Sequence, residues 1–373
     1  MTGSFGYFGA MPLRSLRKAI KHAYLYLRQS ILSALPKEIF GGELPRQIDS
    51  LLIISQRRLG DIALEIPALC GLHQTYAKAT LAVVAPSVYH PLLTWACRPD
   101  ELFEYPGDRL STRNLVATLR REQWQVVIDL TTDYHLAPAR LARASGAKVR
   151  IGFECSGRGH YFNIVIPEAP EEHMADRFRR PLVRLGINTT DQAPLPSLPE
   201  APPSIPVKKP GSRLTGIHPG ATHWTQRWPA DYYAELAVKI HKAGDTCVVI
   251  GGEEDRALVE QICRMAEGAV ATSIIAAGVL ELAAAVNSLD VLVCNNSGPL
   301  HLAGLLGVPT LSFMGPTIKE RWWPRSPAAR VLRRDDLSCI GCNQTYCRIR
   351  THACMREISP SLAYEAYKTL AST

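Results

Sequence analysis

The chain alternates between short apolar runs and longer segments whose apolar residues recur at helical spacing. In the first half, the apolar runs predict strands at 51–55, 81–85, 102–105, 126–130 and 149–153. In the second half, they predict strands at 214–218, 246–250, 291–295 and 310–313. This alternation is typical of parallel sheets covered by helices on both faces. We therefore predict an α/β fold of two doubly wound, Rossmann-like domains that face a cleft.

Residues 191–212 interrupt the alternation with seven prolines, which exclude a regular helix or a central strand. This composition predicts a semi-rigid linker between the two domains. An N-terminal extension (1–48) and a first domain (49–190) precede the linker. A second domain (213–357) and a C-terminal helix (358–373) follow it, and we expect this helix to pack back on the first domain.

The N-terminal extension contains an amphipathic helical pattern from residue 13 to residue 35. Its apolar face consists of Leu13, Leu16, Ile20, Ala23, Tyr24, Leu27, Ile31 and Leu35. The basic residues around that face are Arg14, Arg17, Lys18, Lys21 and Arg28. A basic amphipathic helix with aromatic residues suits an anionic membrane surface, and it also suits packing on the protein's own body. The basic residues interrupt any signal-peptide core, so we expect a cytoplasmic protein, in contact with the membrane through this helix.

The length of 373 residues exceeds what one core usually supports, which agrees with two domains. The net charge of +8 favours acidic partners, although a solvated surface explains it equally well. The charge is spread without a long basic run or a recognisable nucleic-acid module, so no nucleic-acid partner is expected. Six cysteines scattered through apolar segments are predicted to be reduced core residues: Cys70, Cys97, Cys155, Cys247, Cys263 and Cys294.

The first chemical motif, RLGDI at 58–62, follows the first predicted strand. Gly60 allows a sharp turn, and Asp61 then begins a helix at the carboxyl edge of the sheet. Glu65 lies one turn later on the same face. Two carboxylates this close repel each other, which suits a general base because one of them then titrates higher than usual. An aspartate at this position is equally a good helix N-cap.

A second motif, IHPGAT at 217–222 followed by WTQRWP at 224–229, joins a predicted strand to a helix. Its glycine-containing loop offers backbone N–H groups to an anion, and Thr222 and Arg227 are candidate phosphate contacts. The alternative is a plain connection with Pro229 at the start of the next helix.

The third motif, NNSGPLH at 295–301, also joins a buried strand to a helix. Ser297 is a natural N-cap, and the free N–H groups of the helix start suit a pyrophosphate. Gly298 permits close approach of a ligand, and His301 lies on the first turn, although a lone histidine is more often structural. Thr317, in the GPT run after the next strand, would line the same site.

These three motifs, in this order, resemble the heptosyltransferases of glycosyltransferase family nine. RLGD leading to PAL is similar to that family's opening motif, HPGA…RWP to the start of its second domain, and NxSGPxHLA with GVPT and GPT to its donor signature. The resemblance implies a GT-B fold and an inverting transfer from a nucleotide-sugar donor, leaning to ADP-heptose, onto an anionic lipopolysaccharide-like glycolipid. It implies no catalytic metal or other cofactor.

By this resemblance Asp61 is the general base that takes the proton of the acceptor hydroxyl. Arg58, Gly60 and Glu65 lie on the acceptor side, in the first domain. The donor-binding residues, in the second domain, are Thr222, Gln226, Arg227, Asn296, Ser297, Gly298, His301 and Thr317.

Two positions depart from the family pattern. Gln226 stands where the family often has lysine, so the grip on phosphate loses a point charge. Asn296 stands where the family has aspartate before SG, which affects recognition of ribose or sugar. These departures allow an altered donor or a weak enzyme.

Four cysteines cluster near the C-terminus: Cys339, Cys342, Cys347 and Cys354. A CxxC pair followed by two further cysteines can surround a metal, although the intervals are shorter than in common zinc modules. Similar clusters occur in related protein-modifying heptosyltransferases, which implies a structural iron or zinc. The alternative is four reduced thiols.

Two other functions stay open. One keeps the fold but modifies a protein acceptor, as in autotransporter heptosylation, and the other is a degenerate nucleotide-binding scaffold without turnover. A dinucleotide-dependent enzyme is disfavoured because the first strand-to-helix turn lacks a GxGxxG loop. Neither the sugar nor the oligomeric state is predicted.

Overall fold

The computed structural model describes residues 13–45, 47–187, 189–190, 194–208, 210–326 and 328–370. Several predictions fall partly outside the described residues. The side chains of residues 13–18 lie outside, and with them Leu13, Arg14, Leu16, Arg17 and Lys18 of the predicted amphipathic helix. So do residues 191–193 and 209 of the predicted linker and the last three residues of the predicted C-terminal helix.

The chain forms two compact units. One contains the residues up to Ile54 together with Pro106–Glu168, and the other contains Ser55–Tyr105 together with the chain from Ala169 onward. Helices α2 (Leu59–Thr75) and α10 (Gly298–Leu306), which carry most of the predicted chemistry, belong to the same unit.

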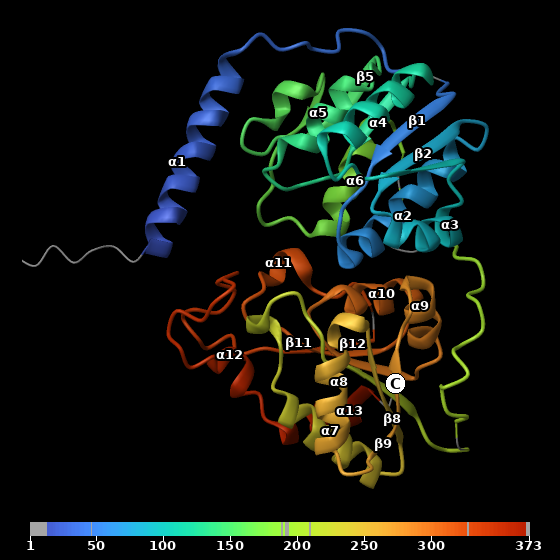
Figure 1. The fold of residues 1–373 in the computed structure, drawn as a ribbon, viewed down its shortest axis with the longest axis vertical. Coiled ribbons are helices and arrows are strands. Elements are labelled where there is room, and N and C mark those ends of the chain that lie inside the picture. The colour runs from blue at the N-terminus through green and yellow to red at the C-terminus, as the bar shows by residue number, and fades with distance from the viewer. Residues whose placement is uncertain are drawn as a thin grey trace, which may run out of the picture. The chain divides into compact units, whose positions relative to one another are not determined.

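The first sheet has six strands in the order β3-β2-β1-β4-β5-β6. Figure 1 labels β1, β2 and β5 of this sheet. They are β1 (Ser50–Ile54), β2 (Thr80–Ala85), β3 (Glu101–Glu104), β4 (Val126–Asp129), β5 (Val149–Phe153) and β6 (Ile164–Ile166). The helices of this region are α2, α3 (His90–Cys97), α4 (Arg109–Arg121), α5 (Leu136–Ala144) and α6 (Met174–Arg184). Strand β1 pairs in parallel with β4, with Leu51 opposite Val126. The central strands β4 and β5 are buried along their whole length, as expected for strands covered on both faces.

The second sheet has six parallel strands in the order β12-β11-β10-β7-β8-β9. They are β7 (Leu214–His218), β8 (Thr246–Gly251), β9 (Val270–Ile275), β10 (Val291–Asn295), β11 (Thr310–Phe313) and β12 (Ala329–Leu332). The helices are α7 (Ala230–Lys242), α8 (Arg256–Met265), α9 (Val279–Asn287), α10, α11 (Lys319–Trp322), α12 (Ala353–Arg356) and α13 (Pro360–Leu370).

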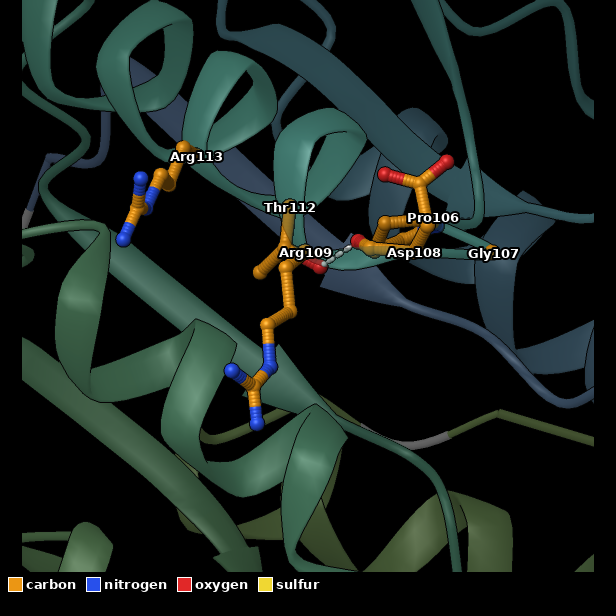
Figure 2. Close-up of a pocket in the computed structure, with 6 residues that line it drawn as sticks. All are labelled: Pro106, Gly107, Asp108, Arg109, Thr112 and Arg113. Atoms are coloured by element: carbon orange, nitrogen blue, oxygen red, sulfur yellow. Dashed lines mark hydrogen bonds between the residues drawn. The ribbon is translucent and has the colours of Figure 1, made fainter.

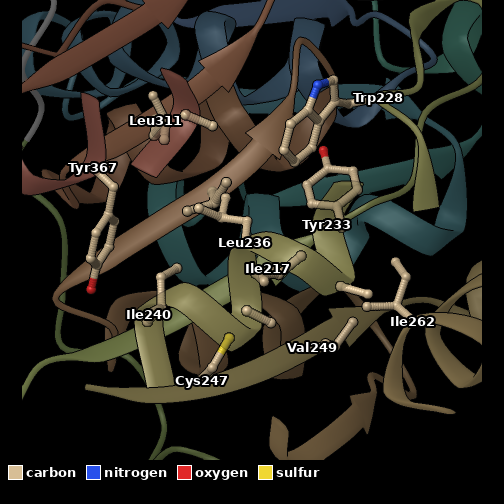
Figure 3. Close-up of a cluster of buried hydrophobic side chains, with 14 of the residues drawn as sticks. Ile217, Trp228, Tyr233, Leu236, Ile240, Cys247, Val249, Ile262, Leu311 and Tyr367 are labelled. Atoms are coloured by element: carbon tan, nitrogen blue, oxygen red, sulfur yellow. The ribbon is translucent and has the colours of Figure 1, made fainter. Parts of the chain in front are cut away.

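Helices cover both faces of this second sheet, so it is doubly wound as predicted. On one face, side chains of α7, α8 and α13 pack on alternate strand residues, and Figure 3 shows part of this cluster. The Trp228 ring stacks on Phe313 at 4.0 Å between centroids, and Tyr233 meets Trp228 edge-on at 4.9 Å. On the other face, α9 and α10 pack on the remaining strand residues.

The C-terminal helix α13 packs in the core of the second sheet. The sequence had led us to expect that this helix packs on the first domain. Its Tyr367 is buried, and the Tyr367 hydroxyl lies 2.7 Å from the Thr215 hydroxyl on β7. The same hydroxyl donates to a carboxylate oxygen of Asp245 at 2.8 Å. These polar contacts hold the apolar side of α13 against the sheet.

Helix α1 (Leu13–Ala34) packs on the first unit along one side only. Arg28 donates from Nε to the Ser156 carbonyl at 3.0 Å and from Nη2 to the Tyr134 carbonyl at 2.7 Å. Leu25 and Leu32 are half-buried on this side, whereas Leu27 and the other large apolar residues of the neighbouring stripe are exposed. In the part of the chain that the structure describes, no helix is both long and apolar enough to cross a membrane.

Candidate functional site

The loop after β1 is anchored by the buried carboxylate of Glu65, which lies in α2. The Ser55 hydroxyl donates to both Glu65 oxygens, at 2.9 and 3.2 Å, and the Gln56 N–H donates at 2.7 Å. Glu65 is fully buried. Its carboxylate therefore shapes the turn that carries Arg58 and Gly60. This is a positioning role, whereas the sequence led us to expect Glu65 beside the acceptor. Arg58 itself is exposed.

Two glycines bring the starts of α2 and α10 into van der Waals contact. A Cβ atom added at Gly60 would lie 3.3 Å from the Cα of Gly298 and 3.0 Å from Cδ2 of His301. A Cβ added at Gly298 would lie 2.9 Å from the Cβ of Leu59. Only glycine at both positions permits this approach without a shift, so the RLGD and NSGPxH motifs form one site.

Asp61, next to Gly60, is half-buried in the first turn of α2. Tyr89, which follows β2, hydrogen-bonds the backbone of Leu59 and lies near the Asp61 carboxylate. Burial raises the pKa of the Tyr89 hydroxyl, and the carboxylates of Glu254 and Asp61 raise it further. Tyr89 thus belongs to the site although it lies in no motif. The sequence signal that could have identified Tyr89 is its position just after the predicted strand 81–85.

His301 is held as a neutral imidazole inside this site. It is buried, and burial lowers its pKa to about 3, with the imidazole of His173 adding to the effect. Its Nδ1 has no hydrogen-bond partner among the described residues. An unpaired buried nitrogen beside a helix start indicates a ligand-facing group.

His173 and Arg325 form a second layer behind His301. His173 Nε2 lies 2.8 Å from the Trp323 carbonyl, while its Nδ1 accepts from the N–H of Ala175 and from Nε of Arg325, each at 3.2 Å. These partners fix Nε2 as the protonated nitrogen of a neutral ring. Arg325 also pairs with Asp176. Sequence analysis missed this group because His173 and Arg325 lie 152 residues apart and in no motif.

The loop after β7, residues Thr222–Pro229 (loop A), is held by the side chains of Asn295 and Arg227, which bond main-chain atoms in and just before the loop. Asn295, at the end of β10, accepts from the Trp228 N–H at 2.9 Å and donates to the Pro219 carbonyl at 2.7 Å. Arg227 donates from Nε and Nη2 to the Ala221 carbonyl, at 3.0 and 2.8 Å. Two of the N–H groups of Arg227 that were predicted to bind phosphate are therefore used to shape loop A. Thr222 is exposed and Gln226 is half-buried.

The two residues before Gly298 behave differently from expectation. Ser297 occupies the N-cap position of α10, but its side chain makes no capping hydrogen bond. Asn296 donates from Nδ2 to the Trp322 carbonyl at 2.9 Å. An aspartate has no hydrogen to donate there, so the departure from the family pattern at Asn296 has a structural use.

The run after β11, residues Met314–Thr317 (loop B), brings Thr317 into the same unit. Thr317 is buried, and its hydroxyl has no partner among the residues that the structure describes. Arg333 holds the loop from outside by donating from Nη1 to the Thr317 carbonyl at 2.8 Å. Thr317 and His301 thus both present unsatisfied buried polar atoms.

The four clustered cysteines are half-buried free thiols. Burial, together with the neighbouring thiols of Cys342, Cys339 and Cys347, raises the pKa of Cys354 to about 11, which indicates that the four side chains lie near one another. Even so, no group of three or more histidine, cysteine or acidic side chains in the described ranges is arranged to hold a metal ion. The predicted iron or zinc site is therefore not supported.

A surface pocket of about 480 Å³ lies in the other unit, at the start of α4 (Figure 2). It is lined by Pro106, Gly107, Asp108, Arg109, Thr112 and Arg113. Asp108 caps the helix by accepting from the Ser111 N–H at 2.8 Å, so that helix start is already satisfied. No predicted site residue lines this pocket.

The arrangement around Asp61 and α10 suits one kind of chemistry. A carboxylate can take a proton, while an adjacent helix start with a neutral histidine can stabilise negative charge on a leaving group. The geometry therefore favours a transfer reaction in which a base takes a proton from the attacking group while the leaving group departs as an anion.

The comparisons with known proteins agree with this reaction class. A model of the family "Glycosyltransferase family 9 (heptosyltransferase)" matches residues 112–352. Lipooligosaccharide heptosyltransferase 2 from Campylobacter jejuni serotype O:2 is 27% identical over 164 residues, 43% of this chain and 51% of that protein. The chain thus spans about half the length of this relative. Lipooligosaccharide heptosyltransferase 2 from Haemophilus influenzae is 24% identical over 344 residues, 86% of this chain and 99% of that protein.

Among solved structures, E. coli ADP-heptose lps heptosyltransferase II matches with a TM-score of 0.68 at 21% identity. The match covers 86% of this chain and 98% of that one. This likeness confirms the predicted fold class, a GT-B type with two parallel α/β sheets.

Replacing Gly298 by alanine tests the close approach of α2 and α10. The new Cβ must displace Leu59, so we expect the free energy of unfolding to fall by about 1–3 kcal/mol in urea titrations. Gly304→Ala, on the same helix, is the matched control, since its nearest neighbour would lie 3.9 Å away. Equal stability of the two variants would contradict the close contact.

The buried neutral state of His301 predicts a pH-dependent stability. Below pH 6.5 the unfolded chain protonates this imidazole, whereas the folded protein keeps it neutral down to about pH 3. The unfolded state therefore binds more protons, and stability falls as the pH drops through this window. Between pH 7 and pH 5, wild type should lose about 2 kcal/mol more than His301→Gln in urea titrations. Parallel pH profiles would show that His301 titrates normally.

Proposed function

Because the chain belongs to glycosyltransferase family 9, the heptosyltransferase family, we propose that it transfers a heptose with inversion from ADP-heptose to a lipopolysaccharide-core acceptor. The observation that supports this proposal is the close approach of the Gly60 turn to the Gly298 turn, because Asp61 directly follows Gly60. The name of the E. coli structure, which includes ADP-heptose, supports the choice of donor.

In the proposed reaction, an acceptor hydroxyl attacks the anomeric carbon of the heptose while Asp61 takes its proton. A new C–O bond forms as the bond between the anomeric carbon and the diphosphate oxygen breaks. The diphosphate leaves with its negative charge, which the N–H groups at the start of α10 stabilise. His301 and Thr317 have buried, unsatisfied polar atoms with which to bind the donor. Thr222, Gln226 and Arg227 contribute from loop A.

No cofactor enters this mechanism. A bound metal is not needed if the start of α10 and neutral hydrogen-bond donors stabilise the negative charge of the leaving diphosphate. The amide of Asn296 acts indirectly, since it holds the Trp322 backbone, and the ring of Trp322 lies 5.7 Å from that of His301.

Asp61→Asn removes the base while keeping its shape. We expect kcat to fall about 10²–10⁴-fold, because the proton of the acceptor is no longer taken. Affinity for ADP in calorimetry should stay within about twofold, and ADP should bind more tightly than UDP or GDP. Asp231→Asn, in the first turn of α7, is the matched control and should leave kcat unchanged.

Three outcomes would overturn parts of this proposal. Tighter binding of UDP or GDP would replace the donor but keep the mechanism. Full turnover by Asp61→Asn would remove Asp61 as the base. Failure of wild type to bind any of the three nucleotides would favour a scaffold without turnover.

We further propose that α1 holds the protein on the cytoplasmic face of an anionic membrane, where its acceptor lies. Its 22 residues include five basic and no acidic side chains. Beside the packed side of α1 runs an exposed apolar stripe, with Ile20 60%, Leu27 59% and Ile31 54% exposed. Exposed apolar and aromatic residues on a basic helix are typical of interfacial membrane binding.

Replacing Ile20, Leu27 and Ile31 together by serine tests this membrane contact. We expect the variant to lose most of its flotation with phosphatidylglycerol vesicles, and wild type to bind phosphatidylcholine vesicles weakly. A triple serine variant at the exposed Leu110, Val207 and Leu362 controls for lost surface hydrophobicity. Equal flotation of both variants, or a change in oligomeric state on the α1 variant alone, would point away from lipid.

A further inference from the structure

The cysteine-rich segment, defined as residues Cys339–Cys354, touches both loops that line the proposed donor site. Most of it has no regular secondary structure, and only its last two residues lie in α12. Loop A follows β7 and loop B follows β11, and in the sheet these strands are separated by β10. A connection between the two loops therefore has to come from outside the sheet.

On the loop A side, Thr225 is the point of attachment. Its hydroxyl donates to the Gln344 carbonyl at 2.9 Å, and Nε2 of His352 donates to the Thr225 carbonyl at 2.8 Å. Thr225 is 2% exposed, so both hydrogen bonds are sheltered from water. The His352 ring also meets the exposed ring of Trp224 at 5.0 Å between centroids. Thr225 lies directly before Gln226 and Arg227 of the proposed donor site.

On the loop B side, Asn343 is the point of attachment. Its N–H donates to the Pro316 carbonyl at 2.7 Å, one residue before Thr317. Gly315 lies close to the end of the same segment, since an added Cβ would lie 3.0 Å from Sγ of Cys354 and 2.6 Å from Sδ of Met355, the residue after the segment.

Asn343 and Gln344 are consecutive, so two adjacent residues tie together two loops that the sheet keeps apart. We propose that the cysteine-rich segment is a positioning clamp, which holds loops A and B at the spacing needed to bind the nucleoside diphosphate of the donor. The site it serves is the one assigned under the proposed function, on which this inference rests. Gln344 stiffens the bridge by donating from Nε2 to the Cys342 carbonyl at 2.9 Å.

The clamp assigns positioning roles to Thr225, Asn343, Gln344 and His352, none of which touches the reacting atoms. Loss of one attachment should loosen both loops, because the bridge transmits the change from one to the other. A merely structural role would loosen the altered loop alone or lower stability without changing donor affinity.

Thr225→Val removes the donated hydrogen bond and keeps the shape of the side chain. Hydrogen–deuterium exchange of the protein without nucleotide should become faster in loop A and also in loop B. Affinity for ADP should fall about two- to tenfold, the range expected for one hydrogen bond, with donor KM rising and acceptor KM unchanged. Thr215→Val is the matched control, because it also loses a buried hydroxyl contact, to Tyr367 at 2.7 Å. It should leave exchange in both loops and donor KM unchanged.

A pair of variants at His352 gives a second, independent test. The side-chain amide of His352→Gln can still donate to the Thr225 carbonyl, whereas His352→Leu cannot. We expect the glutamine variant to keep slow exchange in loop B and the leucine variant to lose it.

Faster exchange confined to loop A in both Thr225→Val and His352→Leu would overturn the clamp. So would a lower kcat with unchanged donor KM, which indicates a smaller folded fraction. If wild type binds no nucleotide, the proposed function fails, but the exchange of loop B still decides whether the clamp exists.

Discussion

The contact of two helix starts through Gly60 and Gly298 is the constraint on which the site depends. It brings the turn that precedes Asp61 against the electropositive start of α10. A Cβ added at Gly298 would force a neighbour to shift, and one added at Gly60 would require its neighbours to move by a few tenths of an ångström. In the proposed reaction, proton transfer and stabilisation of the leaving anion both need atoms at hydrogen-bond distance, so even a small shift would weaken both.

Polar groups away from the reacting atoms keep this contact in register. Glu65 holds the strand-to-helix turn from inside the fold, and Asn295 does the same for loop A. His173 with Arg325 backs the neutral imidazole of His301. Each of these groups has its partners inside the protein, whereas His301 Nδ1 and the Thr317 hydroxyl have none among the described residues. The contrast separates residues that shape the site from residues that face a ligand.

Much of the fold followed from the sequence because buried parallel strands are continuous apolar runs. Four predicted strands, among them 214–218 and 291–295, agree with the structure at both ends. The strands that were missed, β6, β9 and β12, are all edge strands. All three are partly exposed, and β9 and β12 carry polar residues that break their apolar pattern, whereas β6 is apolar but only three residues long.

The site was predictable only where its residues lie in motifs. Asp61, Gly298 and His301 lie in motifs and so became candidates, whereas Tyr89 and His173 join the candidate site through tertiary packing alone. Sequence spacing also suggested a metal at the four cysteines, but spacing says nothing about how side chains point, and the described thiols do not form a ligand set.

The attachment of α1 has a consequence for how this extension can evolve. Arg28 grips the carbonyl oxygens of Tyr134 and Ser156, atoms that every amino acid possesses. Substitutions at those two positions therefore leave the acceptor oxygens in place, while an insertion or deletion in either loop moves them out of reach. Drift in sequence at these two positions keeps the Arg28 contacts, although replacing Tyr134 also removes the ring that lies 3.9 Å from Lys21 Nζ, whereas drift in loop length breaks the Arg28 contacts.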